Sequence, residues 1–184
     1  IRHAARVALE NQALEQWKLP ALTESNTKKA LSALMALARS SDPKVQSQIF
    51  DRLNDLPWEG LPAQWQLVAL RTYQLAFTRM GGGRPGDRNP IIKKIVTASE
   101  KSAEVRMEVS RLLIYLKAPG IVPGLLNYVV DAASPEERLF YLFHMRHIGD
   151  GWTPAHRRAY FAWLKKMIEL RGESHYKTYL KHIA

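Results

Sequence analysis

The stretch from residue 102 to residue 150 is the part of this sequence that most restricts how the chain can fold. Its apolar residues recur at helical spacing in two blocks, and Pro119-Gly120 opens a third apolar segment at 121–130 between them. The two blocks consist of Val105, Val109, Leu112, Leu113 and Leu116, then Leu139, Leu142 and Phe143. Helices this apolar can bury their faces only against one another and against neighbouring helices. The stretch therefore predicts a stacked array of helices.

Four expected helices begin with the same local chemistry, which is a polar capping residue followed by proline. They start at Asp42-Pro43, Asn89-Pro90, Ser134-Pro135 and Thr153-Pro154. Glu137 completes a capping box with Ser134, and Asn26 is a further candidate N-cap. Outside the central stretch we expect helices over 2–11, 12–24, 27–39, 44–56, 62–79, 91–100, 155–170 and 174–183. We also expect a break at Leu19-Pro20, and an end to the Ser134 helix at Gly149 and Gly151.

No segment shows the sustained alternation of apolar and polar residues that is typical of a strand. About ten helices at nearly regular spacing give helix pairs of roughly 35 to 45 residues, the range of HEAT and armadillo units. The sequence therefore predicts an all-α fold. In its finer form, the prediction is a HEAT- or armadillo-like right-handed α-solenoid of about five helix pairs. Residues 1–184 are expected to form a single repeat domain that is a fragment of a longer chain.

Residues 81–90, GGGRPGDRNP, contain four glycines and two prolines, and we expect them to form a flexible loop. A loop that cradles phosphate would need the Gly-x4-Gly-Lys-Ser/Thr pattern after a strand, and this sequence has neither. We therefore interpret residues 81–90 as a surface loop between two helices.

Composition excludes several classes of site. The chain has no cysteine, which excludes disulfides, Cys-ligated metals, covalently attached c-type haem and thiol nucleophiles. No apolar run approaches the ~20 residues that a membrane span needs. The first ten residues, IRHAARVALE, are amphipathic and lack the apolar core of a signal peptide.

Three segments carry a resemblance to a known family. They are IRHAARVALE at 1–10, RLLIYLKAPGIVPGLL at 111–126, and the run that begins at Gly151-Trp152-Thr153 and continues through Arg157, Tyr160-Phe161 and Trp163. Together they resemble the HEAT-like segment of large secreted bacterial proteins that also carry a c-type haem domain. The resemblance implies a scaffold inside a multidomain extracytoplasmic, or periplasmic, protein and transfers no catalytic residue. This chain departs from the family in its glycine-rich insertion at 81–86 and in lacking a haem-attachment sequence.

Candidate catalytic and metal-binding residues each have a structural alternative. His144 and His147 are three residues apart and could share a helix face as metal ligands do, but no carboxylate accompanies them at the spacing of one turn. Asp51 and Asp55 lie near Trp58 and Trp65, and an acid beside aromatic rings could act on a base extruded from DNA. The alternative for the acids is a solvated helix face. The aromatic residues at 140–163 could stack on bases if exposed, but their spacing beside leucines favours a core position.

The net charge of +10 comes from 27 Lys and Arg against 17 Asp and Glu. A basic surface of this kind attracts nucleic acid, other polyanions or acidic partners. The candidate binding residues are Arg2, Arg6, Arg106 and Arg111, which could form a ladder along a concave face. The alternative is that these arginines cap helix ends and pair with Glu10, Glu104 and Glu108, and we favour it because Glu104 and Glu108 would dilute a polyanion site.

The leading function hypothesis is a non-catalytic scaffold or protein-interaction module within a larger multidomain protein. Its partners would be another protein or neighbouring domains of the same polypeptide, and we expect no cofactor and no metal. The alternative is a nucleic-acid-binding HEAT-like domain, including a DNA glycosylase of the alkylpurine type. Duplex DNA or another polyanion would then bind to the basic face.

Overall fold

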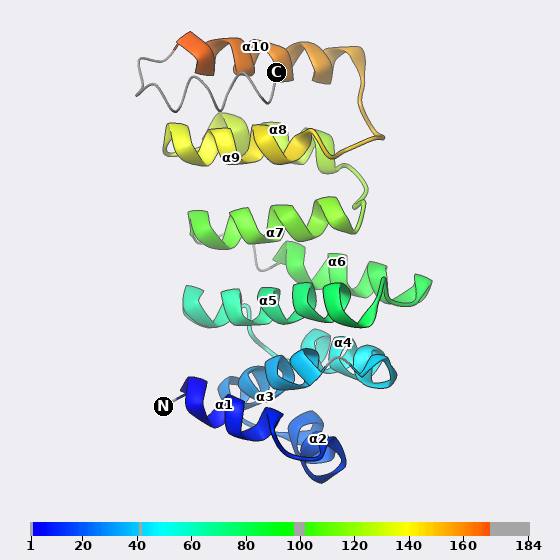
Figure 1. Ribbon diagram of the computed structural model, residues 1–184. Coiled ribbons are helices and arrows are strands. Elements are labelled where there is room, and N and C mark those ends of the chain that lie inside the picture. Colours follow the sequence, from blue (N-terminus) through cyan, green and yellow to red (C-terminus); the bar gives the residue numbers. More distant parts are fainter. Residues whose placement is uncertain (1, 41, 98–101, 170–184) are drawn as a thin grey trace. The chain divides into compact units, whose positions relative to one another are not determined.

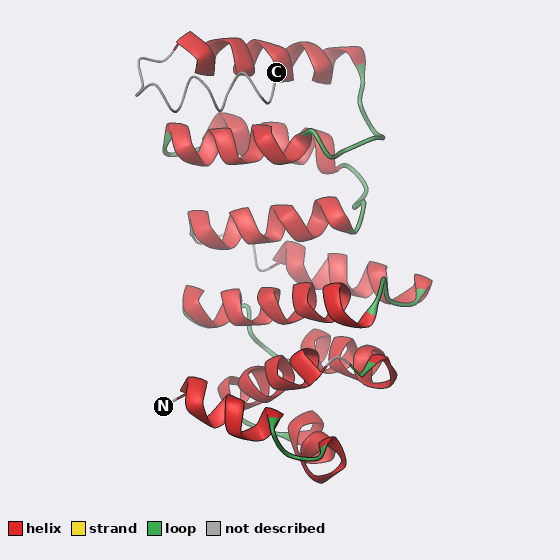
Figure 2. Ribbon diagram, viewed as in Figure 1, coloured by secondary structure: helices red, strands yellow, loops and turns green. Residues whose placement is uncertain are grey.

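The structure, a computed structural model, describes residues 2–40, 42–97 and 102–169 of the 184-residue chain. Within these ranges the chain forms ten α-helices and two short 3₁₀ helices, and it contains no strand (Figure 1 and Figure 2). The all-α prediction is confirmed. The elements are α1 (Arg2–Glu10), α2 (Leu14–Thr23), α3 (Thr27–Ser40), η1 (Pro43–Val45), α4 (Gln46–Asp55), α5 (Ala63–Met80), η2 (Pro85–Asp87), α6 (Arg88–Thr97), α7 (Ala103–Tyr115), α8 (Ile121–Asp131), α9 (Pro135–Met145) and α10 (Pro154–Glu169).

The chain divides into two compact units, Ile1–Val109 and Ser110–Ala184, and each is described by itself. The first unit contains α1 to α6 and the first half of α7. The second unit contains the rest of α7 and α8 to α10. The single domain over 1–184 stays a prediction.

Side-chain caps begin several helices where the sequence predicts them. In each case an oxygen of the capping side chain accepts a hydrogen bond of 3.0 to 3.1 Å from a backbone N–H two or three residues later. The pairs are Asn26 with Lys29, Asp42 with Lys44, Ser134 with Glu137, and Thr153 with His156.

Two predicted helix ends are wrong. α2 runs through Pro20 without a break because Trp17 and Ala21 are buried on either side of it, and α2 packs on α3. This packing outweighs the one backbone hydrogen bond that proline removes. α9 ends at Met145 rather than at Gly149, because the next residues turn back, with the N–H of Ile148 bonded to the carbonyl of Met145. The expected helix over 174–183 lies outside the described residues.

The glycine-rich loop is shorter than the predicted span of 81–90. Only residues 81–84 form an irregular connection, since η2 follows and α6 begins at Arg88. The predicted helix start at Asn89-Pro90 is wrong, because both residues lie in the first turn of α6, which continues directly from η2. The Asp87 carboxylate accepts a hydrogen bond of 2.8 Å from the backbone N–H of Arg84 and closes the η2 turn. Gly83 has φ of 73°, and a Cβ atom there would lie 3.1 Å from the Phe77 ring and 3.3 Å from the Phe50 ring. The loop is therefore held against the core of the first unit.

Helix α3 is the centre of the first unit, where it packs against α1, α2, α4 and α5. Leu31, Leu34, Met35 and Ala38 are all at most 9 % exposed, as their helical spacing predicts. A cluster of rings fills the space between α4 and α5. Its members are Phe50, Tyr73 and Phe77, with Phe50 centroids 6.0 Å from Tyr73 and 4.6 Å from Phe77.

A buried glutamine joins α4 to the end of α5. Gln46 is 7 % exposed, and its Nε2 donates to the carbonyl of Ala76 at 3.1 Å and to the carbonyl of Gly81 at 2.7 Å. Both side-chain N–H groups are thus used by backbone oxygens of another element. An apolar replacement would leave these oxygens without this partner.

In the second unit, α8 packs against α9 and α10. Tyr141 is fully buried and its hydroxyl donates to Glu137 Oε1 at 2.9 Å. The Tyr160 hydroxyl donates to the carbonyl of Leu142 at 3.2 Å and ties α10 to α9. Leu112 and Leu113 of α7 and Leu116 just after it are at most 7 % exposed. Val105 and Val109, the predicted apolar residues of α7 that belong to the first unit, are at most 1 % exposed.

Within each unit, the main packing contacts between α-helices join a helix to the next helix or to the next but one. In the first unit α2, α3, α4 and α5 contact one another in sequence order. In the same unit α1 packs on α3, α3 on α5, α2 on α4 and α4 on α6. The odd-numbered helices α1, α3 and α5 thus form one row, and the even-numbered helices α2, α4 and α6 form a second row.

Candidate protein-binding groove

A cavity of about 410 Å³ opens among α1, α2, α3 and α5 in the first unit, and we call it the α2–α3 groove. Trp17 and Trp65 contribute to its floor and are 6 % and 8 % exposed. The remaining apolar lining residues are Leu9, Pro20, Ala21 and Ala33, and the polar ones are Glu24, Lys28, Lys29 and Ser32. The groove therefore combines an apolar floor with a polar rim.

The α2 wall of the groove is fixed by hydrogen bonds at both ends of the helix. The indole N–H of Trp17 donates to the carbonyl of Gln12 at 3.4 Å. At the other end, Arg52 of α4 donates through Nη2 to the carbonyl of Glu24 at 2.6 Å. These bonds tie the Trp17 side chain to the residues before α2 and tie the residue after α2 to α4.

The α3 wall begins with two exposed lysines, Lys28 and Lys29. The first turn of α3 contains no acidic residue. A cation at this end of a helix opposes the helix dipole, at a cost of about 0.3–1 kcal/mol for each charge. Glu24 is the one acid that lines the groove, and its Oε1 accepts a hydrogen bond of 2.9 Å from the backbone N–H of Asn26. The two lysines therefore make the rim electropositive.

A groove of this size and lining can accept apolar side chains from a partner helix. Ligand pockets of about 300–1,000 Å³ bury most of a small ligand, and a groove between helices can take the apolar face of an amphipathic helix. The lysines on the rim would favour a partner with acidic residues beside its apolar ones.

The candidate arginines are not gathered into one described cluster. The side chains of Arg2 and Arg6 lie outside the described residues. Arg106 is half-buried and Arg111 is exposed, both on α7. The Arg111 Nε donates to His144 Nε2 at 3.2 Å, and its guanidinium lies 5.1 Å from the centre of the Phe140 ring. Whether these arginines form a polyanion ladder stays a prediction.

Two of the three glutamates expected to pair with those arginines also contact other side chains. Glu10 forms an ion pair of 2.6 Å with Arg39. Glu108 accepts a hydrogen bond of 2.6 Å from Gln74 Nε2. Glu104 is exposed at the start of α7.

Both ring nitrogens of His144 contact protein groups. Nδ1 lies 2.8 Å from the carbonyl of Phe140, and Nε2 accepts from Arg111, so the neutral ring carries its proton on Nδ1. His147 Nε2 accepts from Arg146 Nε at 3.3 Å. Among the described residues, no group of three or more His, Cys, Asp or Glu side chains is placed to hold a metal ion. In the same part of the chain, no helix is both long and apolar enough to cross a membrane.

The acids and rings considered for base excision do not form an exposed pair. Asp51 and Asp55 are exposed on α4. Trp58 is fully buried, and its indole N–H donates to the carbonyl of Leu53 at 3.0 Å. Trp58 and Trp65 therefore offer no exposed ring face beside these acids on which a base could stack.

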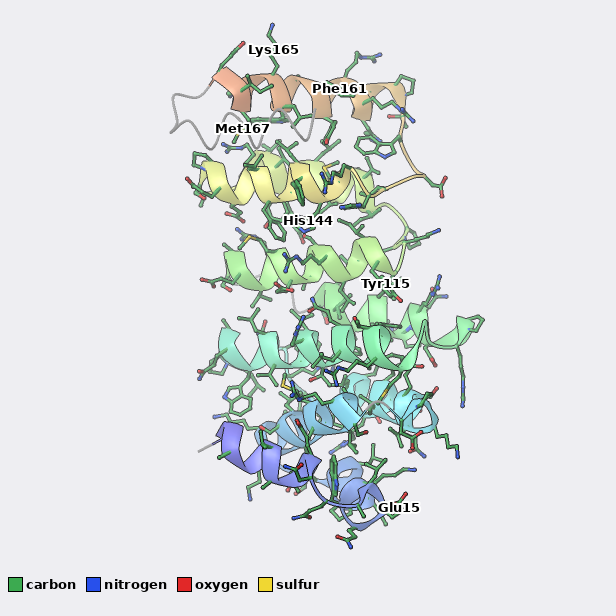
Figure 3. All side chains as sticks on the ribbon, in the orientation of Figure 1. Glu15, Tyr115, His144, Phe161, Lys165 and Met167 are labelled. Atoms are coloured by element: carbon green, nitrogen blue, oxygen red, sulfur yellow. The ribbon has the colours of Figure 1, made fainter. Side chains whose placement is uncertain are left out.

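The aromatic residues of α9 and α10 are only partly in the core. Tyr141 and Tyr160 are buried, as predicted. Phe161 is 57 % exposed, which corrects the expectation that it is a core residue. The buried side of α10 is formed by Tyr160, Leu164 and Met167, and in Figure 3 Lys165 extends from the opposite side of the helix to Met167. Trp163 is half-buried, with Arg138 and Lys166 at 4.9 and 4.7 Å from its ring centre.

The sequence reasoning did not identify the α2–α3 groove. Its clearest signal is the pair Lys28-Lys29, two and three residues after the Asn26 cap, where acidic residues are favoured. A second signal is Pro20, which lies inside a helix three residues after Trp17.

Comparisons of the chain with protein-family models, with curated proteins and with solved structures returned no match. Its function is therefore argued from the geometry of the described residues.

Proposed function

We propose that this chain is a non-catalytic protein-interaction module of HEAT-like, right-handed α-solenoid architecture that belongs to a larger multidomain protein. Its α2–α3 groove binds an amphipathic helix with an apolar face and acidic flanks. The single observation that carries the proposal is the combination of a tryptophan floor with two lysines at the start of α3.

The solenoid architecture is supported by the order in which helices pack. In the first unit, helices pack against the next helix or the next but one in sequence. A row of stacked helix pairs produces contacts of this kind. Long-range contacts between helices distant in sequence, which a closed bundle would need, are not among the main packing contacts of this unit.

The acidic partner is supported by the charges that line the groove. Two cations and one carboxylate line it, and the carboxylate of Glu24 already accepts a backbone hydrogen bond. The lysines are placed where they weaken the helix that carries them, so their positive charge stabilises a bound acid more than it stabilises α3. A basic or neutral helix would gain only the apolar contacts.

The test uses two labelled amphipathic peptides, one with leucine on one helical face and glutamate on the other, and one with lysine in place of glutamate. We expect fluorescence anisotropy to show that the acidic peptide binds more tightly. Lys28→Glu with Lys29→Glu should lower the affinity for the acidic peptide about tenfold or more, because each charge reversal replaces an attraction with a repulsion. The same variant should not be less stable, since it places carboxylates in the first turn of α3.

A matched control is Lys165→Glu with Lys166→Glu, an adjacent exposed pair on α10 that does not line the groove. It makes the same change in net charge and should leave peptide affinity nearly unchanged. Equal binding of the two peptides, or an equal loss in both double variants, would contradict the proposal. Excision of alkylated bases from duplex DNA that disappears in Asp51→Asn or Asp55→Asn would contradict the non-catalytic role.

A further inference from the structure

A second cavity, of about 590 Å³, lies in the second unit and shares no residue with the α2–α3 groove. It is formed by the connection between α7 and α8, the connection between α9 and α10, and the first turn of α10. We call it the loop cavity. Its walls are built largely from isoleucine, valine, proline and glycine residues of these connections, and its charged or titratable side chains are Lys117, His147, Asp150 and His156.

The groups that line the loop cavity or bond to a lining side chain include two cations and one carboxylate. Lys117 contributes an ammonium group, and Asp150 is the one carboxylate in the lining. Arg146 adds a further positive charge beside the cavity, because its Nε donates to His147 at 3.3 Å. The field inside the cavity therefore favours an anion.

The two histidines each keep one ring N–H for a ligand. His147 accepts through Nε2 from Arg146, so its neutral ring carries the proton on Nδ1. His156 accepts through Nδ1 from the backbone N–H of Thr153 at 3.4 Å, so its neutral ring carries the proton on Nε2. With the ammonium of Lys117, the cavity thus has three side chains that donate hydrogen bonds.

The backbone at Lys117 gives an independent reason to assign a role to its side chain. Lys117 has φ of 53° and is the one residue other than glycine with positive φ in the described part of the chain. Its N–H donates to the carbonyl of Ile114 and the N–H of Ala118 donates to that of Leu113, both at 3.0 Å, which is the Schellman ending of a helix. Glycine is the residue that this position favours. At this end of α7 the exposed ammonium gains only the helix-dipole interaction, which is small at an exposed site, whereas an anion in the cavity would gain a charged hydrogen-bond donor.

We propose that the loop cavity binds a small phosphate monoester that also carries hydroxyl groups. Lys117, His147 and His156 donate hydrogen bonds to the phosphoryl oxygens, and Asp150 accepts one from a hydroxyl of the ligand. Lysine and histidine N–H groups bind phosphate through charge-assisted hydrogen bonds. Asp150 would repel a bare phosphate, and this repulsion gives the site a preference for a hydroxylated ligand.

Isothermal titration calorimetry on the whole chain at low salt tests the proposal, with glycerol 3-phosphate, inorganic phosphate and glycerol as probes. We expect both phosphates to bind, glycerol 3-phosphate more tightly, and glycerol not at all. Lys117→Gly should lower the affinity for glycerol 3-phosphate about tenfold or more, because it removes a charged hydrogen-bond donor. Its melting temperature should stay the same or rise, because glycine suits positive φ. Asp150→Asn should raise the affinity for inorganic phosphate several-fold and reduce the preference for glycerol 3-phosphate.

The matched control is Lys165→Ala, which removes an exposed lysine of the same unit that does not line the cavity and should leave the affinity unchanged. Lys28→Glu with Lys29→Glu should leave phosphate binding unchanged as well, so this test is separate from that of the groove. Absence of phosphate binding, unchanged affinity in Lys117→Gly, or an equal loss in Lys165→Ala would overturn the proposal. An Asp150→Asn variant that keeps the full preference for glycerol 3-phosphate would overturn the role of Asp150.

Discussion

Replacing Tyr73 by phenylalanine should make the stability of the first unit less sensitive to alkaline pH. Tyr73 is fully buried, and its hydroxyl donates to Asn54 Oδ1 at 2.9 Å. Burial raises the pKa of Tyr73 well above its ordinary value of 10.0, and the negative charges of Glu59 and Asp55 raise it further. The folded chain therefore keeps this proton at a pH where the unfolded chain has lost it.

The sign and size of the effect follow from this difference in proton binding. The contribution of Tyr73 to stability is complete below the unfolded pKa of 10.0 and is lost as pH rises toward the folded pKa. In that window the free energy of unfolding falls by about 1.4 kcal/mol for each pH unit. Tyr73→Phe has no such loss but lacks the hydrogen bond to Asn54, at a cost of about 1–2 kcal/mol at neutral pH. The unchanged protein and the Tyr73→Phe variant should thus become equally stable near pH 11, roughly one pH unit above the ordinary pKa of tyrosine.

Urea unfolding followed by far-UV circular dichroism at neutral pH and at several values above 10 measures this difference. Phe50→Leu is the control, because Phe50 packs against the Tyr73 ring and has no titrating group, so its deficit should not change with pH. A Tyr73→Phe deficit that stays constant or grows with rising pH would refute the reasoning.

Two further predictions concern a helix cap and a pair of arginines. Ser134→Ala should lower the free energy of unfolding by about 1 kcal/mol, because Ser134 Oγ caps α9 through the N–H of Glu137 at 3.1 Å, and thermal unfolding should show this loss. The exposed Ser25, changed to Ala, is its control, and an equal loss there would contradict the capping role. Arg106→Ala with Arg111→Ala should leave the affinity for duplex DNA or heparin unchanged at low and moderate salt, because Arg111 is engaged by His144 and Phe140. A marked loss of affinity with a reduced salt dependence would instead favour the polyanion ladder.

Four of the five capped helix starts could be predicted from the sequence because their chemistry is local, whereas Asn89 lies inside α6. Asn26, Asp42, Ser134 and Thr153 each cap a backbone N–H two or three residues later, so a few adjacent residues contain the whole signal. The continuity of α2 could not be predicted in this way. It depends on Trp17 and Ala21 packing in the first unit, and this stabilisation comes from residues distant in the sequence.

Neither cavity could be predicted from the sequence, because each is lined by residues from several separate segments. The α2–α3 groove needs four helices to be placed, and no single segment reveals it. The loop cavity contains Lys117, whose positive φ marks the end of α7. The sequence predicts a turn at Pro119-Gly120, but it does not show that Lys117 is the residue with positive φ. The spacing of the aromatic residues beside leucines predicts a core position for Phe161, and this prediction is wrong. The buried residues of α10 are instead spaced as Tyr160, Leu164 and Met167, and Phe161 lies outside that line.

The hydrogen bonds of Gln46 have a consequence for how the first unit opens. Its side chain, anchored in α4, holds the carbonyls of Ala76 and Gly81 at the end of α5. When α4 separates from α5, these two oxygens lose a partner that water must replace, and the last turn of α5 loses its support in the same event. Opening of α4 and fraying of α5 are therefore coupled, and slow hydrogen exchange at the end of α5 is a property of both helices rather than of α5 alone.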